Sequence, residues 1–137
     1  MKTIFQKPLI LDGAMGTELT KKGIKTPLPL WSAIANEENY NEVVDVHKSY
    51  IDNGCNIITT NTFRTTERTY KKAGYKNSFL ASNNSSDLAI KAANEARKNH
   101  DTLIAYSIAP LEDCYEPDNF PGQLVAFKEY HLSLIHI

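Results

Sequence analysis

The sequence has 137 residues, with 15 Lys+Arg against 16 Asp+Glu for a formal net charge of −1, and 42% of its residues are hydrophobic. This ordinary globular composition has no concentrated basic surface for a nucleic acid and no apolar run long enough to span a membrane. The first seven residues carry no apolar signal segment, so we expect a cytoplasmic protein in which Cys55 and Cys114 are free thiols.

Three short apolar segments predict strands of a parallel sheet covered on both faces: residues 8–11, 56–60 and 102–108. Helical patterns lie between and after them. We expect a helix soon after the first strand and a second helix over residues 43–51, which ends at Gly54. A third helix is expected over residues 66–73. A fourth should begin at Ser85 and Ser86 as N-caps, and a fifth at about Gln123. His47 falls on the apolar face of its helix, which indicates a structural residue.

This order of elements predicts parallel strands joined by right-handed crossovers. Two folds have this order of elements: an open doubly wound sheet, and a (β/α)₈ barrel, of which this chain would contain about three units. In both folds, ligand-binding groups follow the carboxyl ends of the strands.

The segment after the first predicted strand suits an amino acid better than a phosphate. Gly13 and Gly16 lack the middle glycine of a dinucleotide-binding loop, and no Gly-Lys-Ser/Thr follows them. Asp12 would repel a phosphate but attract an ammonium group, while nearby backbone N–H groups could bind a carboxylate. The alternatives are that Asp12 is a helix N-cap and that Glu18 is a first-turn residue favoured by the helix dipole.

Three further residues are candidates for the same site. Asn61 and Thr62 follow the second predicted strand, so their side chains should lie at its binding edge, unless they only close a local turn. Trp31, the only tryptophan, forms either a pocket wall or part of the core.

Four segments resemble the homocysteine S-methyltransferase family in the correct order: LDGAMGTEL (11–19), LWSA (30–33), VHKSYIDNGCNIITTNTFR (46–64) and SIAPLEDCY (107–115). The resemblance implies that residues 1–137 form a partial domain, the N-terminal portion of a (β/α)₈ TIM barrel with about three βα units. It also implies methyl transfer to the thiol of homocysteine, giving methionine, from a donor such as S-methylmethionine or S-adenosylmethionine. By the same resemblance, the amino-acid end of homocysteine binds at Asp12 and Gly13, Trp31 lines the pocket, and Glu18, Asn61 and Thr62 lie around its mouth.

The family's chemistry depends on a zinc ion bound by three cysteine thiolates, which lowers the pKa of the substrate thiol. In the family these ligands belong to later strands and are not in this chain, and Cys55 and Cys114 lie in segments that supply none. Residues 132–137 match nothing expected of the family. We expect this portion alone to expose apolar sheet surface, to fold poorly and not to methylate homocysteine.

Two alternatives stay open. A barrel lyase or aldolase with a Schiff-base lysine is disfavoured, since no lysine lies on the three predicted strands. A non-catalytic α/β module that binds an amino acid without a metal site should instead be soluble, monomeric and cooperatively folded.

Overall fold

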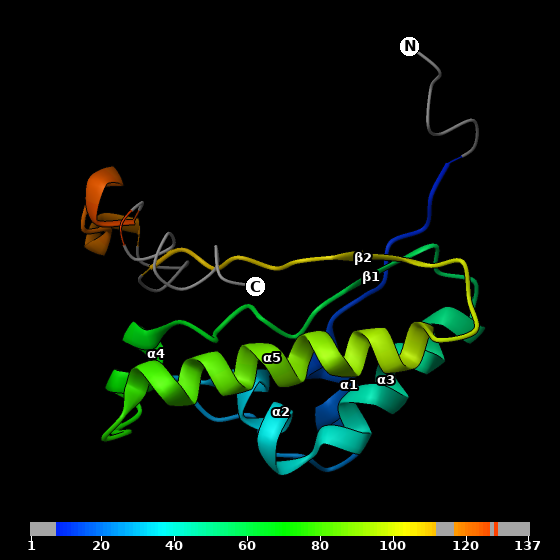
Figure 1. Ribbon diagram of the computed structural model, residues 1–137, viewed down its shortest axis with the longest axis horizontal. Coiled ribbons are helices and arrows are strands. Elements are labelled where there is room, and N and C mark those ends of the chain that lie inside the picture. Colours follow the sequence, from blue (N-terminus) through cyan, green and yellow to red (C-terminus); the bar gives the residue numbers. More distant parts are fainter. Residues whose placement is uncertain (1–7, 112–116, 127, 129–137) are drawn as a thin grey trace.

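The computed structural model describes residues 8–111, 117–126 and 128. It is an α/β fold with a small parallel sheet (Figure 1). Its elements, in chain order, are α1 (Met15–Lys21), the 3₁₀ helix η1 (Trp31–Ile34), α2 (Ala35–Glu38), α3 (Tyr40–Asp52), β1 (Ile57–Thr59), α4 (Glu67–Lys72), α5 (Ser78–Arg97), β2 (Leu103–Ala105) and the 3₁₀ helix η2 (Pro117–Asn119).

The sheet is parallel, as predicted, but its strands are shorter than expected. β1 pairs with β2 so that Ile58 lies opposite Ile104. On its other side β1 contacts the predicted first strand, which is reduced to a single bridge between Leu11 and Ile57. The third predicted strand ends at Ala105 because the backbone of the segment after β1 no longer pairs with the backbone of the segment after β2. There the Thr62 side chain, not a strand backbone, bonds to Ser107.

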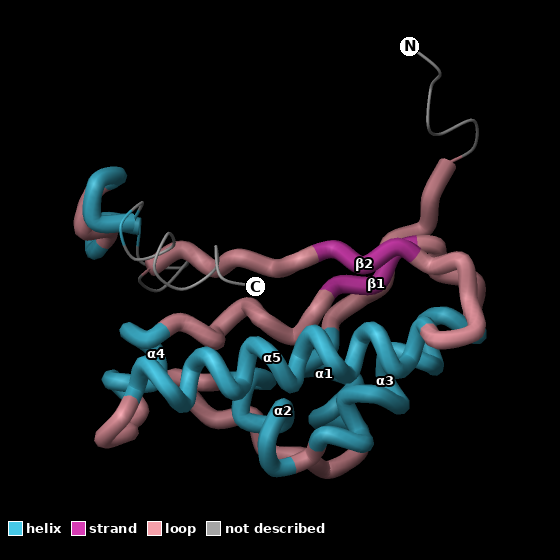
Figure 2. Tube along the Cα trace, in the orientation of Figure 1, coloured by secondary structure: helices cyan, strands magenta, loops and turns pink. Residues whose placement is uncertain are grey.

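The helices α1 to α5 lie on one side of the two strands (Figures 1 and 2). The core forms between these layers, where Leu19 of α1 and Val43 of α3 are fully buried with Ile58 of β1. The buried face of α5 is made of small residues, so this long helix can approach the rest of the core closely. These residues are Ala89, Ala92, Ala93 and Ala96.

The opposite face of the sheet is apolar and has no covering layer among the residues that the structure describes. Leu11, Ile57 and Leu103 are register partners on three adjacent segments, so their side chains share this face. Leu11 is 57% exposed and Leu103 is 46% exposed. One face of the sheet is therefore packed and the other is open.

The helix α4 begins and ends close to where the sequence predicts, whereas α3 ends as predicted but begins earlier, at Tyr40, and neither η1 nor α2 was predicted. Thr66 caps α4 by accepting a hydrogen bond from the Thr69 N–H, and Gly54 and Gly74 follow α3 and α4 with positive φ. The predicted N-caps of the long helix are wrong. α5 begins earlier, with Asn77 as its cap, while Ser85 and Ser86 are buried in its interior and bond to other segments.

Near the C-terminus, residues 123–126 are helical, in agreement with the helix predicted from Gln123. Cys114 and residues 132–137 lie outside the described residues, so the expected free thiol of Cys114 stays a prediction. Within the described part of the chain, no helix combines the length and apolarity needed to cross a membrane.

His47 is structural, as predicted, and its burial is unusual. The side chain is fully buried, and neither ring nitrogen has a hydrogen-bond partner within the described part of the chain. Burial lowers the pKa of His47 to about 4, because it disfavours the charged imidazolium.

We predict that His47 makes the fold less stable in acid. Below about pH 6.5 the unfolded chain binds a proton at His47 before the folded chain does, so the free energy of unfolding falls as the pH drops toward 4. The gap between the two pKa values corresponds to about 3 kcal/mol. Chemical denaturation of the whole protein, as wild type and as His47→Leu, should therefore give free energies of unfolding whose difference grows on acidification. His100→Leu, at an exposed histidine, is the control and should show no such growth. A constant difference for His47→Leu would contradict the prediction.

Candidate functional site

Asp12 joins the end of the first sheet segment to β1. Its two carboxylate oxygens accept hydrogen bonds from the backbone N–H of Thr59, at 2.7 Å, and from the Thr59 hydroxyl, at 2.8 Å. The alternative of a helix N-cap is wrong, because α1 begins after Ala14 and has no side-chain cap. A carboxylate has about four acceptor positions, so the half-buried Asp12 can still accept further donors.

Gly13 follows Asp12 and lies against Tyr50 of α3. A Cβ atom at position 13 would lie 2.8 Å from the Tyr50 hydroxyl oxygen, so the tyrosine side chain would have to shift to admit a larger residue here. Burial, followed by the nearby carboxylates of Glu18 and Asp12, raises the pKa of Tyr50. Glu18 lies in the first turn of α1 and forms a 2.7 Å ion pair with Lys21.

Asn61 connects the end of β1 to η1 and α2. Its amide nitrogen donates to the Ser32 carbonyl at 2.7 Å and to Asn36 Oδ1 at 2.8 Å, and its Oδ1 accepts from the Ser32 hydroxyl at 2.7 Å. Asn61 is buried, and its partners are more than 20 positions away in the sequence. The alternative of a local turn therefore does not hold for Asn61.

Asn36 is the residue of this network that sequence reasoning missed. It is fully buried, and its amide nitrogen donates to the Asn61 carbonyl at 3.1 Å and to the Ser85 hydroxyl at 3.0 Å. The only sequence signal was an asparagine in a helical segment, which commonly faces water. Asn36 thus holds β1, α2 and α5 together from the inside.

Thr62 links the segment after β1 to the segment after β2. Its hydroxyl donates to the Ser107 carbonyl at 2.7 Å and lies 2.9 Å from the Thr60 hydroxyl. Thr62 is buried, and it does both things that the sequence left open: its hydroxyl bonds across the sheet edge, and its carbonyl accepts from the Thr65 N–H and hydroxyl in a local turn.

Trp31 lies in an aromatic and cationic cluster beside the same edge. Its ring stacks on Phe63, with ring centroids 6.1 Å apart and an interplanar angle of 18°. The Arg64 guanidinium carbon lies 4.7 Å from the centre of the Trp31 ring. Trp31 also has a φ of +50°, a conformation that costs a bulky residue on the order of 1–2 kcal/mol, so these contacts hold a strained position.

The structure links some of the six candidate residues at the carboxyl-end edge of the sheet but not all of them, since Glu18 lies on α1 and pairs with Lys21. Asp12 bonds to the last residue of β1, Asn61 holds the residue next to Trp31, and Gly16 of α1 packs against Ser32, which bonds to Asn61. Asn61 and Thr62 point into the protein and bind neighbouring segments, whereas Asp12 is only half-buried. The arrangement is a stiff polar edge with one carboxylate that retains acceptor capacity.

The described residues do not form a metal site. No group of three His, Cys, Asp or Glu side chains among them could hold a metal ion. Cys55, the one cysteine in the described part of the chain, has its sulfur 3.8 Å from the Leu11 carbonyl oxygen. Burial, followed by the nearby Asp12 carboxylate, raises the pKa of the Cys55 thiol, which opposes the thiolate that a metal would bind.

Comparisons with known proteins all point to one family. Residues 9–136 match the family described as homocysteine S-methyltransferase. The chain is 32% identical over 90 residues to homocysteine S-methyltransferase 3 of Zea mays, covering 66% of this chain and 26% of that protein. It is 33% identical over 100 residues to the homocysteine S-methyltransferase of Escherichia coli, covering 73% of this chain and 31% of that protein.

A solved structure shows the same relationship in three dimensions. The homocysteine methyltransferase MmuM of Escherichia coli, in its metallated form, superposes with a TM-score of 0.75 and 26% sequence identity. The similarity covers 90% of this chain and 47% of that one. The chain thus spans about a quarter to a third of the curated relatives and about half of the solved structure.

We predict that Gly13→Ala destabilises the fold by about 1–2 kcal/mol, because its Cβ would meet the Tyr50 hydroxyl. Tyr50→Phe removes that oxygen, so the cost of Gly13→Ala should be smaller in the Tyr50→Phe background. Denaturation of the four proteins of this cycle measures the coupling.

Gly16→Ala is the matched control for this cycle. Its Cβ would lie at an ordinary 3.7 Å from the Ser32 Cβ within a helix, so this change should be neutral or slightly stabilising. Equal costs for Gly13→Ala in both backgrounds would contradict the proposed contact.

We also predict that Asn36→Ala lowers the free energy of unfolding by about 2–3 kcal/mol. The change leaves the buried amide of Asn61 and the hydroxyl of Ser85 without a partner. Asn94→Ala, at an exposed asparagine that bonds within its own helix, should cost less than about 1 kcal/mol. Denaturation curves measure both variants, and equal losses would show that the Asn36 network adds nothing.

Proposed function

Since this chain belongs to the homocysteine S-methyltransferase family, we propose that the whole protein transfers a methyl group to the thiol of homocysteine, giving methionine. The methyl group leaves a sulfonium donor such as S-methylmethionine or S-adenosylmethionine, the new bond forms to the homocysteine sulfur, and the thiol proton is released. The observation that carries this proposal is the match of residues 9–136 to the family.

In this proposal the described residues recognise the amino-acid end of homocysteine. The Asp12 carboxylate, already oriented by two hydrogen bonds from Thr59, accepts a further hydrogen bond from the substrate ammonium. Trp31 supplies an apolar wall, Gly13 follows Asp12, and Glu18 contributes a second negative charge near Tyr50. Asn61 and Thr62 fix the edge of the sheet against which the substrate rests. The stiffness of this edge favours the proposal, because a preorganised site loses less entropy on binding.

The family resemblance implies a zinc ion, and the described residues do not fit it. Their one cysteine faces a backbone carbonyl and has a raised pKa, and no cluster of metal-binding side chains surrounds it. We therefore assign no step of the reaction to a metal held by these residues. Their role is to bind and orient. We further propose that the chain forms the first three βα units of a (β/α)₈ barrel, a proposal favoured by its parallel sheet and by its likeness to the solved relative.

The charge of Asp12 provides the test. Asp12→Asn keeps the size of the side chain: its Oδ1 can still accept from the Thr59 N–H, and its amide nitrogen can donate to the Thr59 hydroxyl. It loses the charge that pairs with an ammonium group. In the whole protein, assayed for methionine formation with each sulfonium donor, we expect the KM for homocysteine to rise roughly ten- to hundredfold, with a smaller change in kcat.

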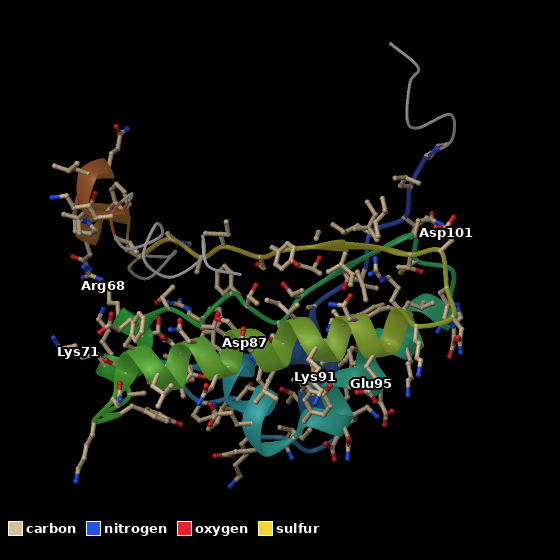
Figure 3. All side chains as sticks on the ribbon, in the orientation of Figure 1. Arg68, Lys71, Asp87, Lys91, Glu95 and Asp101 are labelled. Carbon is tan, nitrogen blue, oxygen red and sulfur yellow. The ribbon has the colours of Figure 1, made fainter. Side chains whose placement is uncertain are left out.

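Asp101→Asn is the matched control. Asp101 is exposed and precedes β2 at the opposite end of the sheet (Figure 3), so its loss should leave the KM unchanged. A wild-type protein that forms no methionine would overturn the proposed function. A wild-type rate with an unchanged KM in Asp12→Asn would overturn only the role of Asp12.

A further inference from the structure

Arg64 is a buried cation next to the proposed homocysteine pocket. It follows the polar segment after β1 and is only 8% exposed. The resemblance places Arg64 in a matching segment but gives it no role.

The Arg64 guanidinium lies against two aromatic rings. Its central carbon is 4.7 Å from the centre of the Trp31 ring and 5.4 Å from the centre of the Phe63 ring. The two rings are themselves stacked, so Trp31, Phe63 and Arg64 form one cluster. Because this cation is almost completely removed from water, its attraction to the aromatic faces is near the upper end for contacts of this kind.

The cluster lies on a main chain of unusual conformation, in which the Trp31 N–H donates to the Pro27 carbonyl at 2.7 Å. Trp31 lies at a positive φ that a bulky residue seldom adopts, and Asn61 fixes the adjacent Ser32. The hydrogen bonds of Asn61 set the position of the main chain but not the direction of the indole. Phe63 and Arg64 both contact the indole ring directly.

We propose that Arg64 is a positioning residue of the homocysteine pocket, whose guanidinium holds the indole of Trp31 as a preformed pocket wall. The role rests on the proposed function, because it assigns Trp31 to that pocket. A planar guanidinium can lie flat on an indole, whereas a lysine ammonium interacts only as a point charge. Arginine at this position therefore fixes the orientation of the ring as well as its distance.

The test compares Arg64→Met and Arg64→Lys in the whole protein. Arg64→Met keeps an unbranched, buried side chain and removes the charge, whereas Arg64→Lys keeps the charge and removes the plane. For Arg64→Met we expect a KM for homocysteine that rises about three- to thirtyfold, with kcat within about twofold of the wild type. The KM of Arg64→Lys for homocysteine should lie between the KM of the wild type and that of Arg64→Met. Arg64→Lys also keeps the test open if Arg64→Met fails to fold.

Tryptophan fluorescence supplies a readout that does not depend on activity. The emission of Trp31 is isolated by subtracting the spectrum of Trp31→Phe made in the same background. In Arg64→Met we expect this emission to shift to longer wavelength and to be more accessible to acrylamide, because the ring is no longer held.

Lys91→Met is the matched control. Lys91 makes the same kind of contact with Tyr40, at 5.6 Å, on the helical side of the protein away from the strands (Figure 3). Its loss should change neither the KM nor the emission of Trp31.

An unchanged Trp31 emission in Arg64→Met would overturn the proposal, and so would a changed emission with an unchanged KM. If the wild type does not methylate homocysteine at all, the proposed function is wrong, and so is the assignment of Trp31 to a homocysteine pocket. The emission would still show whether Arg64 holds the ring, so the two failures are distinguishable.

Discussion

The side-chain amide of Asn61 holds together parts of the chain that the sequence keeps far apart. It donates to the Ser32 carbonyl and to Asn36, and it accepts from the Ser32 hydroxyl, all within a buried region. Inside a protein such bonds are strong, and a missing partner is costly. This amide fixes the position of η1 together with the hydrogen bonds from the Ser85 hydroxyl to the Ala33 carbonyl and from the Trp31 N–H to the Pro27 carbonyl.

The same principle repeats on both sides of β1. The strand is short, and where its backbone ladder ends, polar side chains take over the pairing. Asp12 bonds to Thr59 on one side, and Thr62 bonds to Ser107 on the other. The carboxyl ends of three adjacent segments are thus fixed by side chains, which explains how a two-stranded sheet keeps a defined edge for a ligand.

Sequence patterns predicted the elements whose signals are local. The apolar period of α3 and the glycines after α3 and α4 placed those helices well. Sequence patterns failed where a side chain bonds to a residue far away in the sequence. Ser85 and Ser86 looked like helix caps, but they lie within α5 and bond to residues 21 to 52 positions away. Asn36 and Arg64 were missed as contributors to the site for the same reason, since nothing near them in the sequence reveals a buried network or an aromatic stack.

The two faces of the sheet suggest that different parts of the whole protein bind the substrate and activate its sulfur in the proposed reaction. The helical face is packed, whereas Leu11 and Leu103 are exposed on the other face, and the chain covers 47% of the solved relative. On the proposed function, this portion binds the end of homocysteine that does not react, while the sulfur is activated by groups outside the described residues. Binding energy from a non-reacting part of a substrate can orient the reacting atom. A rigid edge with one available carboxylate suits that role, because it anchors the amino acid and leaves the thiol free to reach the methyl donor.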